Sequence, residues 1–109
     1  SKYDITQRIM ETLINTCHRN VLFSVLNNAK DANQISDELG ISLSAVYKTL
    51  TNLEEMSLVA VEKFVFNDDR KKIKLYKSRI GKAEIKIGNN DAVLELYPNR
   101  TAVNIQQED

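Results

Sequence analysis

Apolar residues recur at helical spacing on either side of a glycine in residues 31–56. Ile35 and Leu39 lie four positions apart, so they share one face of a predicted helix. Gly40 follows at the position where many helices end in a left-handed conformation, which glycine adopts without a steric clash. A second stripe with the same spacing comes after it, made of Val46, Leu50 and Leu53. The pattern predicts two helices joined by a tight turn.

Polar residues mark where each of these helices begins. Asp31 precedes the first helix and Ser42 the second, and both side chains are of types that accept hydrogen bonds from free backbone N–H groups. Ile41 and Val46 are spaced to form a hydrophobic staple at the start of the second helix. The side chains that project away from its apolar stripe are nearly all uncharged and hydrogen-bonding: Ser44, Tyr47, Lys48 and Thr51. Such a helix pair can place its second helix in a DNA major groove.

Two further helices are predicted upstream. The first, over residues 3–14, has an apolar sector that is wide for a terminal helix, made of Ile5, Ile9, Met10, Leu13 and Ile14. An ordinary core helix with a broad face explains this width, and so does a helix that meets a second subunit. The second reading predicts a homodimer interface at Ile5, Ile9, Met10 and Leu13. The next helix is expected from Cys17 to Asn27 or Asn28, with Thr16 as its cap.

After Met56 the pattern changes from helical to alternating. Residues 59–66 are rich in β-branched and aromatic residues, and residues 71–78 alternate, with Ile73 and Leu75 opposed to Lys72, Lys74 and Tyr76. The two segments flank a turn, which predicts a hairpin. A second hairpin is predicted over residues 83–97. Helices followed by a hairpin with a basic return strand make a winged helix, an α+β fold. We expect one domain over 1–109, with N-terminal helices in 1–28, a helix-turn-helix in 31–56, a wing in 59–78 and a C-terminal β-hairpin in 82–97.

The chain has no net charge, yet its charge is unevenly distributed. Residues 70–86 hold eight basic residues against one acidic residue, a balance of +7, whereas residues 1–69 and 87–109 sum to −4 and −3. A local positive segment on a neutral protein is typical of an element that contacts phosphates. The alternative is a lysine-rich strand face that is simply solvated, although like charges crowded along a strand repel one another.

Length and composition limit the class of protein. With 109 residues, of which 42% are hydrophobic and 28% charged, the chain fits one folded domain. No apolar run approaches the roughly 20 residues that span a bilayer, and the N-terminus lacks a signal-peptide pattern. Cys17 is the single cysteine, so no disulfide within the chain is possible and a reducing compartment is expected. These features predict a cytoplasmic protein without a membrane partner.

Neither an enzyme nor a cofactor site is expected. Cys17 and His18 are neighbours that point to different faces of a helix, which does not suit a nucleophile–base pair. No glycine-rich phosphate loop occurs. Because the chain has no other Cys or His, these two cannot build a sulfur/nitrogen metal cage within one subunit. A site shared across a dimer, using both residues twice, stays open as an alternative.

Three stretches of the sequence carry a resemblance to a known group of proteins. They are residues 34–55 (Gln-Ile-Ser-Asp-Glu-Leu-Gly-Ile-Ser-Leu-Ser-Ala-Val-Tyr-Lys-Thr-Leu-Thr-Asn-Leu-Glu-Glu), residues 58–62 (Leu-Val-Ala-Val-Glu) and residues 74–78 (Lys-Leu-Tyr-Lys-Ser). Over residues 18–97 the chain resembles the winged helix-turn-helix regulators grouped as ArsR-like, especially those common in archaea. Residues 82–96 look like the extra strands that follow the wing in some of them.

The resemblance implies a sequence-specific transcriptional regulator that binds double-stranded DNA as a homodimer. It implies a recognition helix over 42–56 in the major groove and a basic wing on the phosphates. The DNA-binding residues that follow are Ser42, Leu43, Ser44, Tyr47, Lys48 and Thr51 in the helix and Arg70, Lys71 and Lys72 in the wing. Metal-sensing members carry paired cysteines in the helix before the recognition helix, and here that helix has none, so no metal is expected. The other interpretation is a winged-helix protein-interaction or assembly module that does not bind DNA.

Overall fold

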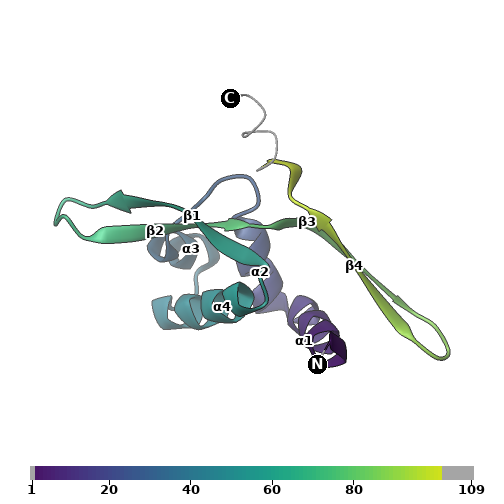
Figure 1. Cartoon of the computed structure of the whole chain (residues 1–109). Helices are drawn as coiled ribbons and strands as arrows, with labels where there is room; N and C mark the ends of the chain where they lie inside the picture. Colours follow the sequence, from purple (N-terminus) through teal and green to yellow (C-terminus); the bar gives the residue numbers. More distant parts are fainter. Residues whose placement is uncertain (1, 102–109) are drawn as a thin grey trace.

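The computed structural model describes the backbone of residues 2–101 and the side chains of residues 5–101, so residue 1 and residues 102–109 of the expected domain lie outside it. In the described part, four helices precede two β-hairpins, which confirms the α+β winged-helix prediction (Figure 1). The helices are α1 (Lys2–Ile14), α2 (Thr16–Ser24), α3 (Ala32–Leu39) and α4 (Leu43–Glu55). The strands are β1 (Val59–Phe66), β2 (Lys72–Ser78), β3 (Ile80–Ile87) and β4 (Ala92–Pro98).

The core lies where α2, α3 and α4 meet. Each helix contributes the apolar residues that its sequence spacing placed on one face, and all of these are at most 1% exposed: Val21, Leu22, Val25, Ile35, Val46, Leu50 and Leu53. Leu58 and Val59 carry the core on to the first strand. At roughly 1.5–3 kcal/mol for each fully buried aliphatic side chain, this cluster outweighs any single surface contact in the domain. The predicted apolar stripe of α4 is therefore confirmed.

The turn between α3 and α4 forms as the sequence predicts. Gly40 ends α3 in the left-handed conformation, with φ 66°, and its N–H donates to the Ser36 carbonyl at 2.9 Å. The Ser42 hydroxyl accepts from the Ala45 N–H at 3.1 Å and caps α4. Ile41 is half-buried against the core that contains Val46, as the staple requires.

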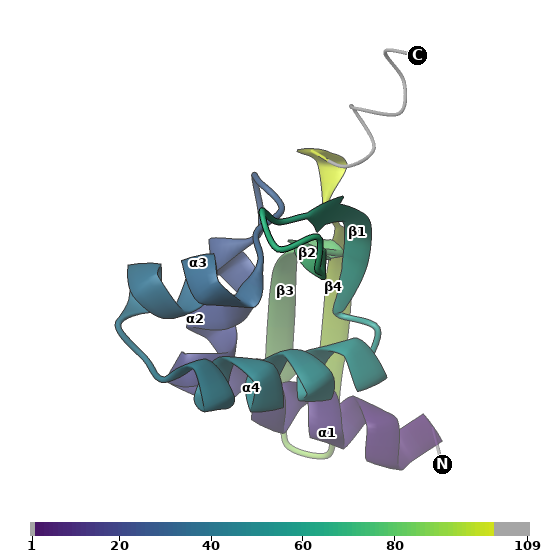
Figure 2. The ribbon, with the colours of Figure 1, turned by 90° about the vertical axis from the view of Figure 1, so that its left-hand side faces the viewer.

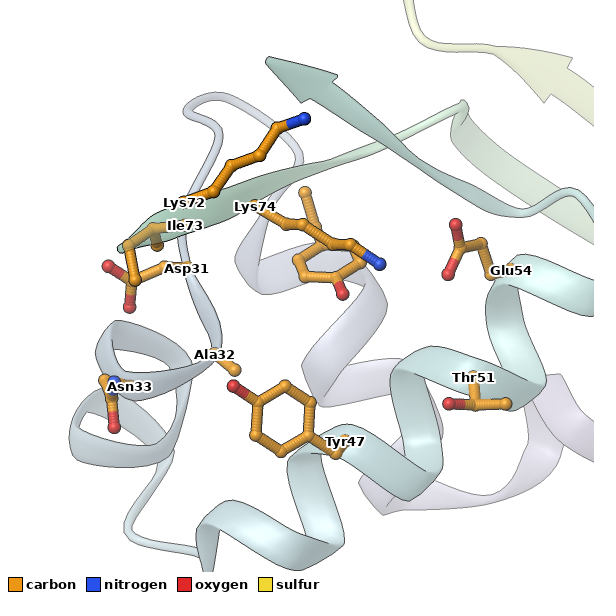
Figure 3. Close-up of a pocket in the computed structure, with 10 residues that line it drawn as sticks. Asp31, Ala32, Asn33, Tyr47, Thr51, Glu54, Lys72, Ile73 and Lys74 are labelled. Atoms are coloured by element: carbon orange, nitrogen blue, oxygen red, sulfur yellow. The ribbon is translucent and has the colours of Figure 1, made fainter. Parts of the chain in front are cut away.

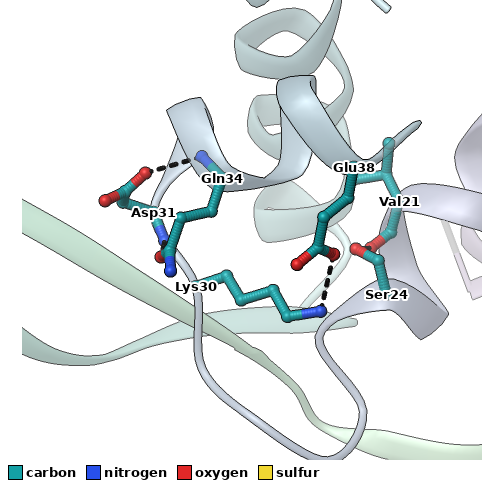
Figure 4. A network of polar contacts seen from close by, with 6 residues as sticks. All are labelled: Val21, Ser24, Lys30, Asp31, Gln34 and Glu38. Carbon is teal, nitrogen blue, oxygen red and sulfur yellow. Dashed lines mark hydrogen bonds and ion pairs between the residues drawn. The ribbon is translucent and has the colours of Figure 1, made fainter. Parts of the chain in front are cut away.

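A capping box begins α3 (Figure 4). The Asp31 carboxylate accepts from the Gln34 N–H at 2.8 Å, and the Gln34 side-chain oxygen accepts from the Asp31 N–H at 2.9 Å. Lys30, just before the cap, forms a 2.7 Å ion pair with Glu38. These contacts fix the start of α3 beside the edge of β2, where the backbone of Lys30 pairs with that of Tyr76.

The second helix departs from the prediction at both ends. Its cap is Asn15, whose side chain accepts from the His18 N–H at 3.0 Å, and not Thr16. It ends at Ser24 and not at Asn27 or Asn28. The reason is tertiary, because the next three carbonyls accept hydrogen bonds from residues far along the chain. Val25 accepts from the Ser78 N–H, Leu26 from the Asn99 side chain and Asn27 from the Lys77 Nζ.

The first hairpin, β1–β2, is the wing, and it projects beyond the helices (Figure 1). Its pairing runs from Val59 opposite Ser78 to Phe66 opposite Lys72, with a bulge between Val61 and Lys63. The inner end of one face covers the core with Val59 and the buried Tyr76. The face of the hairpin that packs on the core therefore continues outward into the exposed part of the wing.

The second hairpin, β3–β4, forms a separate two-stranded sheet with one apolar face and one polar face. Cross-strand neighbours on the apolar face are Ala83 with Leu96, Ile85 with Leu94, and Ile87 with Ala92. The polar face holds Tyr97, whose hydroxyl donates to Glu84 at 2.6 Å and to Glu95 at 2.9 Å. Lys86 pairs with Glu95 at 3.2 Å on the same face. The hairpin is thus amphipathic along its whole length.

Replacing Gly40 with Ala tests the turn. A side chain at φ 66° is strained by about 1–2 kcal/mol, although no atom lies within 4 Å of the added Cβ. We expect the free energy of unfolding, measured by urea titration, to fall by about 1 kcal/mol, because alanine also restricts the unfolded chain. Gly88→Ala is the control, because Gly88 does not have a positive φ and the nearest atom to its added Cβ, at 3.2 Å, belongs to the Asp91 side chain, which can shift. Equal losses in the two variants would contradict this account of the turn.

Candidate nucleic-acid interface

The outward face of α4 exposes the side chains that the sequence pattern placed there. All six residues predicted for DNA contact in this segment are exposed: Ser42, Leu43, Ser44, Tyr47, Lys48 and Thr51. Tyr47 is the largest of them and is 50% exposed. In Figure 2 the helix runs across the domain below the wing. The burial of the apolar stripe on the opposite side fixes this orientation.

A groove of about 350 Å³ lies between this face and the wing (Figure 3). Tyr47, Thr51 and Glu54 form its α4 wall, and Lys72 and Lys74 stand on β2. Figure 3 shows Lys74 extending from β2 into the space above α4. The start of α3 and Tyr76 complete the lining. The structure therefore brings Tyr47 and Thr51 together with Lys72, one of the three predicted wing residues.

Arg70, Lys71 and Lys72 all lie exposed at the tip of the wing. A short turn positions them, in which the Arg70 N–H donates to the Asn67 carbonyl and the Lys71 N–H donates to the Asn67 side chain, both at 2.9 Å. Arg70 itself has φ 62°. These three cations share the exposed tip with Asp68 and Asp69, so residues 67–72 carry a local balance of +1.

The structure divides seven of the eight basic residues of 70–86 into three parts, and the eighth, Arg79, is exposed between the two hairpins. The wing residues up to Lys74 form one group, and Lys82 and Lys86 sit on the polar face of the second hairpin. Lys77 belongs to neither group, because it is buried and its Nζ donates to the Asn27 carbonyl at 3.1 Å. The charge balance of +7 therefore overstates the charge available to a single phosphate-bearing ligand.

Of the ten residues that line the groove, only Tyr47, Thr51 and Lys72 are among the predicted site residues. Sequence reasoning missed the other seven: Asp31, Ala32, Asn33, Glu54, Ile73, Lys74 and Tyr76. Tyr76 shares the strand face of Lys72 and Lys74, yet it is 6% exposed. Burial raises the pKa of its hydroxyl, and the negative charge of Glu54 and the nearby Tyr47 raise it further. The alternation of β2 correctly places Tyr76 on the same face as Lys72 and Lys74. Only the fold shows that the end of this face nearest the helices is buried.

His18 lies near the exposed face of α4, close to Lys48. Its Nδ1 is 2.9 Å from the Asn15 side-chain oxygen. Partial burial lowers its pKa below 6.5, and the positive charge of Lys48 lowers it further. Cys17 beside it is exposed. Among the described side chains, no group of three or more His, Cys, Asp or Glu is arranged to hold a metal ion.

The residues predicted for a dimer interface fall into two groups. Ile9 and Leu13 are buried in the core of this chain, whereas Ile5 is exposed and Met10 is half-buried. An ion pair from Arg8 to Glu55 at 3.0 Å joins α1 to the end of α4. A second groove, of about 240 Å³, separates α1 from the tip of β3–β4 and is lined by Gln7, Met10, Glu11, Ile14, Ile85, Ile87 and Ala92. No helix of residues 2–101 has the length and apolar character needed to cross a membrane.

Comparisons with known proteins leave the family open. No family model and no curated protein sequence matches the chain. Among solved structures, the chain is similar to the Vibrio cholerae ferric uptake regulator (Fur), a protein with DNA-binding domains, at 13% identity and a TM-score of 0.43. The similarity covers 86% of this chain and 75% of that one. A likeness this distant carries no argument about function.

The titration of His18 tests the placement of Lys48. As the single histidine of the chain, it gives one unambiguous set of imidazole signals in an NMR titration. We expect a pKa below 6.5 in the folded protein and a partial rise in Lys48→Ala, because burial, the larger cause, remains.

The same shift has a consequence for stability. Because the unfolded chain binds a proton more readily than the folded one, the contribution of His18 is complete above pH 6.5 and is lost as pH falls from 6.5 toward the lowered pKa. His18→Gln should remove that pH dependence.

A His18 pKa that is unchanged by Lys48→Ala would contradict the proximity of the His18 and Lys48 side chains.

Proposed function

We propose that this protein is a sequence-specific DNA-binding transcriptional regulator. The observation that carries the proposal is the groove in which the hydrogen-bonding face of α4 and the lysine-bearing face of the wing stand opposite each other. A helix lying in a major groove needs side chains that can reach base edges, and the adjacent hairpin needs cations for phosphates. Both requirements are met on one side of one domain. The likeness to ArsR-like, archaeal-type regulators is part of the proposal, as is a cytoplasmic location.

Within this interface the two elements have different roles. Tyr47, Lys48 and Thr51 project from the middle of α4 and read base edges. Ser42, Leu43 and Ser44 lie at the start of the helix, where the free backbone N–H groups also favour a phosphate. Arg70, Lys71 and Lys72 contact phosphates and set the register of the protein on the duplex without specifying sequence.

The proposal includes a homodimer, because part of the apolar face of β3–β4 stays exposed to solvent in the single chain. Ile87 is 80% exposed at its tip, and Ile14 on the facing helix is 67% exposed. A two-stranded hairpin is marginally stable by itself in water, so an amphipathic one needs a partner for its apolar face. A second copy offers the same helix and hairpin, and self-complementary contacts of this kind are those of a two-fold dimer. Two recognition helices then contact half-sites about 34 Å apart.

Neutralising the wing tests the proposed function. We expect Arg70→Ser, Lys71→Gln and Lys72→Gln, combined, to reduce the slope of log affinity against log salt. With two phosphate contacts per subunit, a dimer loses about four contacts and the slope falls by roughly 3 to 4. Sequence preference should persist, because the base-reading helix is unchanged. The measurement is fluorescence anisotropy on duplexes recovered from mixed genomic fragments, at several salt concentrations.

The matched control removes three cations of the same basic segment that lie outside the wing, Arg79, Lys82 and Lys86. It changes net charge equally, so a slope that falls by the same amount in both variants reports overall charge and not wing contacts. An unchanged slope in the wing variant would favour the alternative function, a protein-interaction module.

Ile87→Glu tests the dimer. A glutamate at this position would bury a charge in the proposed apolar interface, which should weaken association by at least about tenfold, or 1.4 kcal/mol. The control is Val93→Glu, which places the same charge on the polar face of the same hairpin, where Val93 is opposite Lys86. Sedimentation at micromolar concentration should show a dimer for the unchanged protein and for Val93→Glu, and a shift toward monomer for Ile87→Glu. A monomer in all three, both free and on DNA, would remove the dimer from the proposal.

A further inference from the structure

One face of the wing carries two bulky aromatic side chains that stay largely exposed, Phe64 at 46% and Phe66 at 70%. The strand register pairs Phe64 with Lys74 and Phe66 with Lys72, so these four residues project from the same side of the hairpin. The Nζ of Lys72 lies 4.0 Å from the centre of the Phe64 ring, in agreement with this placement. We call Phe64, Phe66, Lys72 and Lys74 the groove face of the wing, because its two lysines line the groove above α4.

The groove face is the outer continuation of a surface that is buried nearer the helices. Tyr76, two residues from Lys74 on the same side, is 6% exposed, whereas Phe64 is 46% and Phe66 70% exposed. The helices end before they reach the tip of the wing (Figure 1). Two aromatic side chains in sequence positions i and i+2 on such a face indicate a ligand with an apolar surface.

The surrounding charge identifies that ligand. Residues 63–74 hold five basic and two acidic residues, so the aromatic rings are set in a positive environment. Each ring is paired across the strands with a lysine. This arrangement suits a nucleic acid, because the cations can neutralise phosphates while the rings stack on bases. An apolar protein surface has no need of these cations.

The turn at the tip of the wing holds the backbone beside Phe66 in place. Phe66 is the last residue of β1, and the turn that follows is closed by the Asn67 N–H donating to the Lys71 carbonyl at 3.1 Å and by the Asn67 side chain. A ring on a closed turn loses little conformational freedom when it inserts, which favours insertion over a flexible contact.

We propose that Phe66 acts as a wedge that enters the minor groove of bound duplex DNA and partly unstacks one base step. This inference rests on the proposed function and adds to it a mode of DNA deformation. With α4 in the major groove, the wing reaches the adjacent minor groove, where inserted apolar side chains kink the duplex by about 20–90°. Lys72 and Lys74 then neutralise the phosphates that approach one another, and specificity arises at a flexible base step that no polar side chain reads.

The test compares two single substitutions at the tip of β1. Phe66→Ser removes the wedge, and Val65→Ser is the control, because Val65 is the neighbouring exposed residue on the opposite face of the hairpin. The probes are end-labelled 30-base-pair duplexes recovered from mixed genomic fragments. End-to-end energy transfer measures bending, permanganate reactivity of thymines measures unstacking, and anisotropy measures affinity.

We expect the unchanged protein and Val65→Ser to bend the duplex by at least about 20° and to expose reactive thymines beside the wing. Phe66→Ser should bind straight DNA with no more than about tenfold lower affinity and an unchanged salt slope, since no charge is lost. Equal bending by Phe66→Ser, or straight DNA under the unchanged protein, overturns the wedge and leaves the proposed function standing. Failure of the unchanged protein to bind any duplex overturns both.

Discussion

The burial of one apolar stripe on α4 is the constraint on which the candidate interface depends. Val46, Leu50 and Leu53 are at most 1% exposed, and their contacts with α2 and α3 fix the rotation of the helix about its axis. With 3.6 residues per turn, that rotation decides that Tyr47 and Lys48 face solvent. A helix held only by caps would turn more freely. The exposed face of α4 is therefore specified by the buried residues on the opposite side of the helix.

The carbonyls of residues 25–27 are a second constraint, and they connect the helices to both hairpins. They accept from Ser78, Asn99 and Lys77, three residues at the ends of β2 and β4. The Asn99 side chain also donates to the Ser78 carbonyl at 2.9 Å and is almost fully buried. This junction sets the direction in which the wing leaves the domain, and hence the width of the groove above α4.

Local sequence signals predicted those parts of the fold that depend on neighbouring residues. The caps at Asp31 and Ser42, the left-handed Gly40 and the alternation of the wing are confirmed, because each is decided within a few residues. The early end of α2 and the buried Lys77 were not predictable, since they arise from hydrogen bonds between residues 50 to 73 positions apart. The same holds for the site: α4 exposes the six predicted residues, whereas Tyr76 belongs to the groove through tertiary packing.

The central claim is that DNA is bound by one side of the domain, between α4 and the wing. Titration of the isotopically labelled protein with a duplex, followed by amide chemical shifts, tests it most directly. The account predicts the largest changes in residues 42–51 and 66–74, with the outer part of β3–β4 little affected. Changes concentrated on the apolar face of β3–β4 and the outer side of α1, with α4 unaffected, would contradict it.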